Sequence, residues 1–217
     1  MPRGFEISQF LFLLKGLEWT FALSVIGLSC GAVGGLGIAL ARTSPFANLR
    51  RATAAYIALF QGTPLLMQLF VTYYGLALIG LELDAWVSVA IGFTLHASAY
   101  LGEIWRGSID AIPRGQLEAA NALGIDYVTR MRKVVLPQAF RISLPATVGF
   151  FVQLIKGTSL AAIVGFTELA RAGSIVANQN FRPLLVYAVV GVLYFGMCWP
   201  LSLCASRLER RLALSAR

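Results

Sequence analysis

The sequence predicts an all-α integral membrane protein with five transmembrane helices and a two-helix loop, built as one domain over residues 1–217. Of the 217 residues, 58% are hydrophobic and only 13% are charged, whereas a soluble domain carries about a quarter charged residues. Four windows without Asp, Glu, Lys or Arg approach or exceed the roughly 20 apolar residues that cross a bilayer. These windows are 19–41, 52–81, 85–102 and 183–206.

A fifth apolar segment, 142–167, contains a single charged residue, Lys156, and is also predicted to cross the bilayer. The predicted spans are about 19–41, 56–79, 86–104, 142–165 and 184–206.

The first two spans carry residues that interrupt a plain apolar helix. Gly27, Gly31 and Gly35 recur every four residues, which lines one face of the first span with residues small enough for close helix packing. In the second span, the segment from Gln61 to Pro64 breaks the apolar run. Because a proline inside a membrane helix leaves a backbone carbonyl without its donor, we expect a kink or a path-lining segment there.

The long polar stretch between the third and fourth spans, about 107–137, is predicted to form two short helices. Pro113 suits the first turn of one helix, and Gly124 stands where a left-handed C-terminal cap is expected. Asp126 can cap the second helix, which Pro137 is expected to end.

The positions of the basic residues predict the orientation. When the loops are assigned alternately to the two sides, one side collects 13 of the 18 Lys and Arg residues. Such residues accumulate in cytoplasmic loops, so the N-terminus is predicted outside, and the C-terminus and the 107–137 loop inside. The net charge of +8 reflects this bias, and a nucleic-acid partner is not expected.

Several kinds of chemistry are excluded by residue counts. His96 is the only histidine, which rules out a multi-histidine metal site, and a structural hydrogen bond between helices is favoured over a functional role for it. No lysine follows a glycine, so the chain has no P-loop for nucleotide hydrolysis. We therefore predict no catalytic residue, no metal and no cofactor in this chain.

The 107–137 loop contains the most specific motif. Glu118-Ala119-Ala120, then Gly124, and twelve positions later Leu136-Pro137, resemble the EAA loop of ABC-importer permeases. Other segments resemble the permeases for polar amino acids: Gly62–Leu66 followed by Gln68, Glu103–Gly107, Ile112–Gln116, Leu136–Ala139 and Lys156–Leu160. The resemblance runs from about residue 20 to residue 207.

The resemblance implies a permease subunit of the bacterial inner membrane whose EAA helices dock on a separate ATP-binding subunit. The implied partners are two such subunits, which bind ATP and Mg, a second permease that is identical or homologous, and an extracytoplasmic solute-binding protein. The residues implied in coupling are Glu118, Ala119, Ala120, Gly124, Asp126, Leu136 and Pro137.

A path for a polar or charged amino acid is predicted from the polar residues of the spans. A charge at mid-bilayer depth usually faces a cavity or a partner, so Lys156 is a candidate. An ion pair with a carboxylate such as Glu168, or snorkelling to the interface, is the structural alternative. The candidate path residues are Gln61, Thr63, Gln68, Lys156, Thr158 and Ser159. Glu168 and Arg171, in the external loop, are predicted to contact the solute-binding protein.

Two other functions remain open from the sequence. A self-sufficient secondary transporter of a small polar solute is the main alternative, although no internal repeat supports it. The segment Gly27–Gly31, with Ser29 at its centre and Asp84 and His96 downstream, also matches the nucleophile elbow of a hydrolase. That motif requires a strand-to-helix turn, whereas Ser29 is predicted to lie within a helix.

Overall fold

The computed structural model of the protein describes residues 6–215, and the side chains up to residue 212. Every regular element among these residues is helical. In chain order the elements are α1 (Ile7–Arg42), α2 (Ala47–Gly62), α3 (Leu65–Phe70), the π-helix η1 (Val71–Gly75), α4 (Leu76–Leu78), α5 (Ala85–Asp110), α6 (Arg114–Ala122), α7 (Tyr127–Arg130), the π-helix η2 (Met131–Val135), α8 (Leu136–Gly157), the 3-10 helix η3 (Thr158–Val164), α9 (Leu169–Asn180) and α10 (Pro183–Ser215).

Four helices within the described residues are long and apolar enough to cross a membrane: α1, α5, the continuous helix Tyr127–Val164, and α10. The pair formed by α2 and the helix Leu65–Leu78 passes the same test together but is bent by 105°. Counting this pair as one broken span gives five, in agreement with the predicted number.

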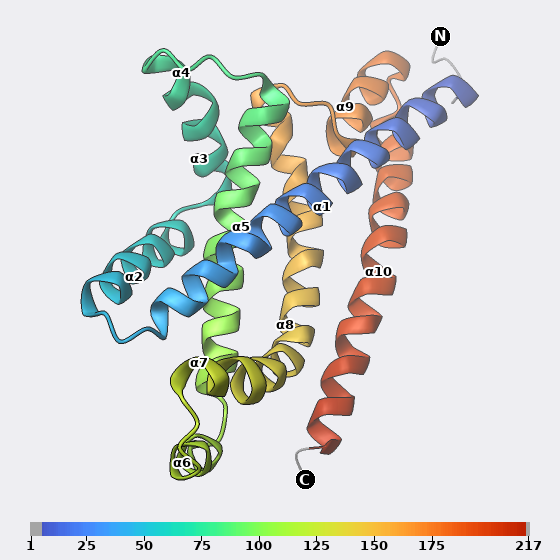
Figure 1. Ribbon diagram of the computed structural model, residues 1–217. Coiled ribbons are helices and arrows are strands. Elements are labelled where there is room, and N and C mark those ends of the chain that lie inside the picture. Colours follow the sequence, from blue (N-terminus) through green and yellow to red (C-terminus); the bar gives the residue numbers. More distant parts are fainter. Residues whose placement is uncertain (1–5, 216–217) are drawn as a thin grey trace.

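The centre of the fold is the crossing of α1 and α5, where α1 runs diagonally over α5 (Figure 1). A Cβ atom at Gly27 would lie 3.0 Å from the Cβ of Phe93, and one at Gly31 would overlap the Cβ of Ala97. The two backbones therefore approach more closely than any side chain on this face of α1 would allow. The predicted glycine face is confirmed.

The first span is longer than predicted, because α1 begins at Ile7 and not near residue 19. Lys15 and Glu18 end the charge-free window, but charged residues do not end a helix. The added turns are held by packing: a Cβ at Gly16 would lie 2.9 Å from the Cβ of Ala172 in α9.

The second span is broken at the predicted place. Helix α2 ends at Gly62, Thr63 is extended, and α3 begins after Pro64. The expected kink is confirmed, and the two halves form a sharp angle beside α5 (Figure 1).

The prediction that Pro137 ends the second loop helix is wrong. Helices α7, η2, α8 and η3 form one continuous helix, and Pro137 is its eleventh residue. The π-turn widens the helix just before the proline, with Leu136 N donating to Met131 O, five residues back. The widened turn carries the helix across the position where the proline lacks a donor. The loop therefore passes into the fourth span without a break.

Helices α9 and α6 lie at opposite ends of the molecule (Figure 1). Helix α9 packs against α1 and α10 at one end of the molecule, where α1 begins. Helix α6 projects at the opposite end, where α10 also finishes (Figure 1).

Candidate functional site

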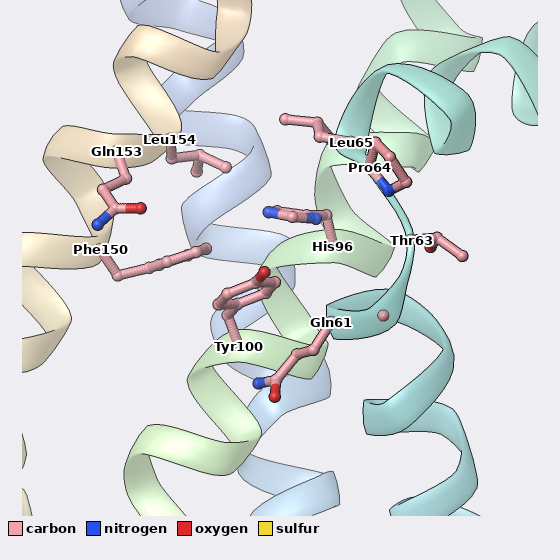
Figure 2. A pocket seen from close by; sticks show the side chains of 10 residues that line it. Gln61, Thr63, Pro64, Leu65, His96, Tyr100, Phe150, Gln153 and Leu154 are labelled. Atoms are coloured by element: carbon pink, nitrogen blue, oxygen red, sulfur yellow. The ribbon is translucent and has the colours of Figure 1, made fainter.

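A cavity of about 490 Å³ lies where the break between α2 and α3 faces α5 and α8 (Figure 2). The described residues that line it include no Asp, Glu, Lys or Arg. They are Gln61, Gly62, Thr63, Pro64, Leu65, His96, Tyr100, Phe150, Gln153 and Leu154. Gln61 and Gln153 are exposed at its rim, whereas His96 is 9% exposed. The wall therefore offers amide, imidazole and phenol groups on an apolar frame, as small-molecule sites do.

The side chain of Gln68 holds the broken backbone. Pro64 has no N–H, so the carbonyl of Phe60, four residues earlier, loses its helical donor. Gln68 Nε2 donates to this carbonyl at 2.7 Å and to the carbonyl of Thr63 at 3.0 Å. One amide thus satisfies two carbonyls that the break leaves open.

His96 connects this amide to the cavity. Its Nδ1 lies 2.9 Å from Gln68 Oε1, which is the interhelical hydrogen bond expected for a lone histidine. The imidazole also packs on two rings, with centroids 4.5 Å from Tyr100 and 6.1 Å from Phe150. These contacts fix the plane and the direction of the ring.

The six predicted path residues separate into two groups. Gln61 and Thr63 line the cavity, and Gln68 lies behind it, 8% exposed. The other three do not line it. Lys156 is exposed, the buried Thr158 donates to Ile155 O at 2.7 Å, and Ser159 donates to Lys156 O at 2.8 Å.

Four polar or aromatic cavity residues were missed from the sequence: His96, Tyr100, Phe150 and Gln153. His96 and Tyr100 are four residues apart on α5 and share a face, which is a signal that the sequence contains. Gln153 lies three residues after Phe150 on α8, so the same spacing could have found it.

Glu168 is completely buried, which corrects its assignment as a contact for a soluble partner. Its carboxylate accepts from Tyr194 Oη at 2.8 Å, from Thr20 Oγ1 at 3.4 Å, and from the backbone N–H groups of Ala170 and Arg171 at 2.9 and 2.8 Å. It therefore caps α9 and ties it to α1 and α10. Among the described residues, Glu168 forms no ion pair with Lys156.

Arg171 is half-buried rather than fully exposed. One of its terminal nitrogens donates to Ala162 O at 3.2 Å, close to the end of η3. Contact with a solute-binding protein stays a prediction for this residue.

Helix α6 ends in the turn that the sequence predicts. Gly124 has φ +68°, Ile125 N donates to Ala120 O at 3.0 Å, and Gly124 N donates to Asn121 O at 2.9 Å. This pair of bonds is the Schellman motif, which requires a left-handed residue where only glycine is unstrained.

Asp126 caps α7 by accepting from Thr129 N at 3.2 Å. Hydrogen bonds from Thr129, and then the charges of Arg130 and Lys133, hold the pKa of the Asp126 carboxyl below its ordinary value, so the cap is ionised at neutral pH. A small core of Ile112, Val135 and Ala139, with neighbouring apolar side chains, joins α6 to the start of α8. Among the predicted coupling residues, Glu118, Ala119, Gly124, Asp126 and Pro137 are exposed, Leu136 is half-buried, and Ala120 is buried.

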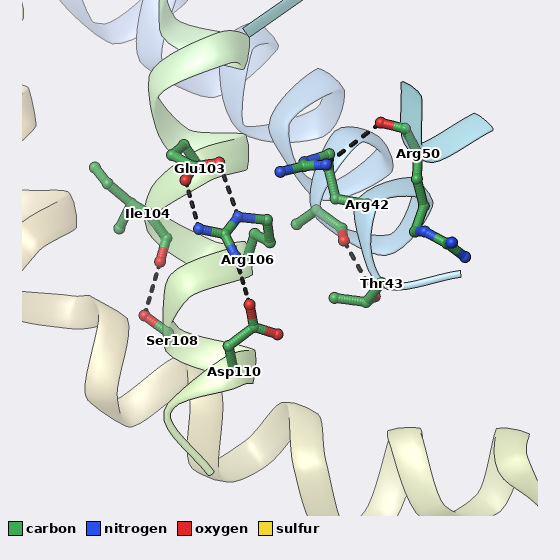
Figure 3. Close-up of polar contacts among 9 residues, drawn as sticks. Arg42, Thr43, Arg50, Glu103, Ile104, Arg106, Ser108 and Asp110 are labelled. Carbon is green, nitrogen blue, oxygen red and sulfur yellow. Dashed lines mark hydrogen bonds and ion pairs between the residues drawn. The ribbon is translucent and has the colours of Figure 1, made fainter. Parts of the chain in front are cut away.

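A charged cluster lies at the end of α5, just before the chain continues into α6 (Figure 3). Arg106 donates to both oxygens of Glu103, at 2.9 and 2.5 Å, and also contacts Asp110. Nearby, Arg42 at the end of α1 donates to Arg50 O at 3.4 Å. These bonds fix the last turns of α5 and the α1–α2 connection.

The hydrolase interpretation fails on geometry. Ser29 lies in the middle of continuous α1, and Gly27 and Gly31 are buried against α5. Asp84 caps α5, and His96 binds Gln68. No strand-to-helix turn presents the serine.

Comparison with known proteins decides the family. Residues 33–214 match the family described as binding-protein-dependent transport system inner membrane component. The chain belongs to this family. The permease is 36% identical over 207 residues to the probable amino-acid ABC transporter permease protein YckA of Bacillus subtilis, covering 95% of this chain and 92% of the relative.

Other relatives agree. The L-cystine transport system permease protein TcyB of Bacillus subtilis is 37% identical, covering 92% of this permease and 86% of the relative. The glutamine transport system permease protein GlnP of Escherichia coli is 34% identical, with 93% of each chain covered. A crystal structure of an amino acid ABC transporter with histidines superposes with a TM-score of 0.87 at 31% identity, covering 96% of this permease and 100% of that chain.

Proposed function

We propose that this permease is the transmembrane subunit of an ATP-driven importer that moves a polar amino acid across a bacterial inner membrane. The names of relatives at 34–37% identity specify amino acids, cystine and glutamine, which supports an amino acid as the substrate. The observation that carries the proposal is the polar cavity beside the α2–α3 break. Its uncharged wall favours a zwitterion whose side chain has no net charge, because an unpaired charge is costly inside the bilayer.

The energy for transport comes from a partner in this proposal. The sequence has no Gly-Lys pair and so no P-loop, which supports hydrolysis of ATP, with its Mg, on separate ATP-binding subunits. Helix α6 suits the docking role because it projects beyond the spanning helices (Figure 1). Around it, Leu123 and Val128 are 77% and 70% exposed, which gives a partner apolar surface to bury.

The small core beneath α6 supports a mechanical role. Because Leu117 of α6 packs against the core of Ile112, Val135 and Ala139, a displacement of α6 is passed to α8, which carries Phe150 and Gln153. The complete importer has two ATP-binding subunits, a second permease and an extracytoplasmic solute-binding protein, with α6 and the end of α10 on the cytoplasmic side.

Copurification and transport test this function together. The tagged chain, purified in mild detergent from its own host, is expected to bring down an ATP-binding subunit and to take up radiolabelled amino acids only with ATP after reconstitution. Gly124→Trp is expected to abolish both, because it forces a bulky residue into a left-handed position at the docking surface.

The matched control is Gly37→Trp, at a position where a Cβ meets no atom within 4 Å. It is expected to behave like the unaltered chain. A chain recovered alone that transports without ATP would overturn the proposal in favour of a secondary transporter.

A further inference from the structure

We propose that His96 recognises the α-ammonium group of the transported amino acid through its Nε2 atom. This inference rests on the proposed function and assigns a specific role within it. The argument begins at Gln68, whose amide orientation is fixed because Nε2 donates to two backbone carbonyls, Phe60 O and Thr63 O. The other end of the amide, Oε1, is therefore the atom that faces His96 Nδ1 at 2.9 Å.

A carbonyl oxygen only accepts hydrogen bonds, so the proton of the imidazole must be on Nδ1. No described carboxylate contacts His96, so no neighbouring group stabilises a second proton on the ring. Nε2 consequently carries a lone pair. The bond from Gln68 thus sets the tautomer of His96, in the way that a second partner commonly does.

This lone pair faces the cavity. Figure 2 shows the far ring nitrogen of His96 directed away from α3, toward Phe150 and Leu154 of α8. Nε2 has no hydrogen-bond partner in the described part of the chain, although His96 is only 9% exposed. The Nε2 atom itself is accessible from the cavity that His96 lines, so a donor on a ligand can reach this free acceptor.

The neighbouring groups suit an ammonium in particular. Tyr100 and Phe150 present ring faces beside the imidazole, and aromatic faces attract a cation. The amides of Gln61 and Gln153, which make no hydrogen bond within residues 6–212, offer N–H donors at the rim for a carboxylate. The cavity therefore provides one acceptor side and one donor side, the pattern of a zwitterion.

Matched ligands and variants test this role in the complex purified with its ATP-binding subunits. The ligands are L-glutamine and glutaramate, which is the same molecule without the α-ammonium group. We expect the unaltered complex to bind L-glutamine about tenfold more tightly or better, as for a hydrogen bond to a charged group.

His96→Asn keeps an amide N–H near the position of Nδ1 and removes the atom at Nε2. We expect it to weaken L-glutamine binding about tenfold and to leave glutaramate binding unchanged, so that the preference disappears. His96→Gln places an amide near the position of Nε2 and is expected to restore part of the preference. Unchanged glutaramate binding shows that the cavity is still folded.

A preference for L-glutamine that survives in His96→Asn would overturn the role of His96 while leaving the proposed function in place. If the unaltered complex bound neither of these ligands and no other amino acid, the proposed function would be overturned, and this inference with it.

Discussion

The buried carboxylate of Glu168 shows how one side chain can hold three helices together. It is completely buried and has no cationic partner among the described residues, yet its oxygens accept from Tyr194, Thr20 and two backbone N–H groups at the start of α9. Donors of this kind, together with the helix N-terminus, replace the water that the charge loses. The sequence places Glu168 in a loop, and only the fold reveals that the loop turns inward.

Removing this carboxylate is expected to destabilise the permease. Glu168→Ala leaves the partly buried Tyr194 hydroxyl and two partly buried backbone N–H groups without an acceptor, which costs about 3 kcal/mol. The loss is measured as a lower unfolding midpoint of the detergent-purified protein. Glu168→Gln, which keeps one acceptor oxygen, should lose less. Glu118→Ala, at an exposed position on α6, should leave the unfolding midpoint unchanged. Equal midpoints for the two alanine variants would contradict the stabilising role of Glu168.

The packing of α1 on α5 gives a prediction at the level of two helices. A Cβ at Gly31 would overlap Ala97, so Gly31→Ala must push the helices apart and is expected to cost about 1–3 kcal/mol. Gly37→Ala, on the same helix, meets no atom within 4 Å and should stabilise by about 0.5–1 kcal/mol. Unfolding midpoints of the two variants should therefore shift in opposite directions. A shift of the same sign would show that the glycine face is not a packing constraint.

The helix features that could be predicted depend on local sequence, whereas those that could not depend on other parts of the fold. The glycine face, the break at Pro64 and the cap at Gly124 depend on local rules of sterics and hydrogen bonding, and all three were predicted correctly. The start of α1 and the passage through Pro137 depend on neighbouring helices and on a π-turn. These determinants lie outside the local pattern.

The cavity was predicted only in part, for a related reason. Gln61 and Thr63 belong to the interrupted segment that the sequence shows directly. His96 and Gln153 lie in helices that are continuous in sequence, and they become cavity residues only because α5 and α8 meet at the break. Lys156 was a candidate because of its charge, but its place on α8 leaves it outside the lining.

The molecule as a whole has two chemically different ends. At one end lie α6, the finish of α10 and the Arg106 cluster, and at the other lie α9 and the beginning of α1 (Figure 1). Most Lys and Arg residues belong to the first end, which the positive-inside rule assigns to the cytoplasm. The charge distribution therefore predicts the orientation, and this orientation would bring α6 to an ATP-binding subunit.

Two single-cysteine variants test this orientation in a chain whose three native cysteines are replaced. Gln116 in α6 and Gln179 in α9 are both exposed and lie at opposite ends, so Gln116→Cys and Gln179→Cys form a matched pair. A membrane-impermeant maleimide added to intact spheroplasts is expected to label Gln179→Cys and to spare Gln116→Cys until the membrane is permeabilised. Inverted vesicles should give the reverse pattern. Labelling of Gln116→Cys in intact spheroplasts would place α6 outside, where no ATP-binding subunit could reach it.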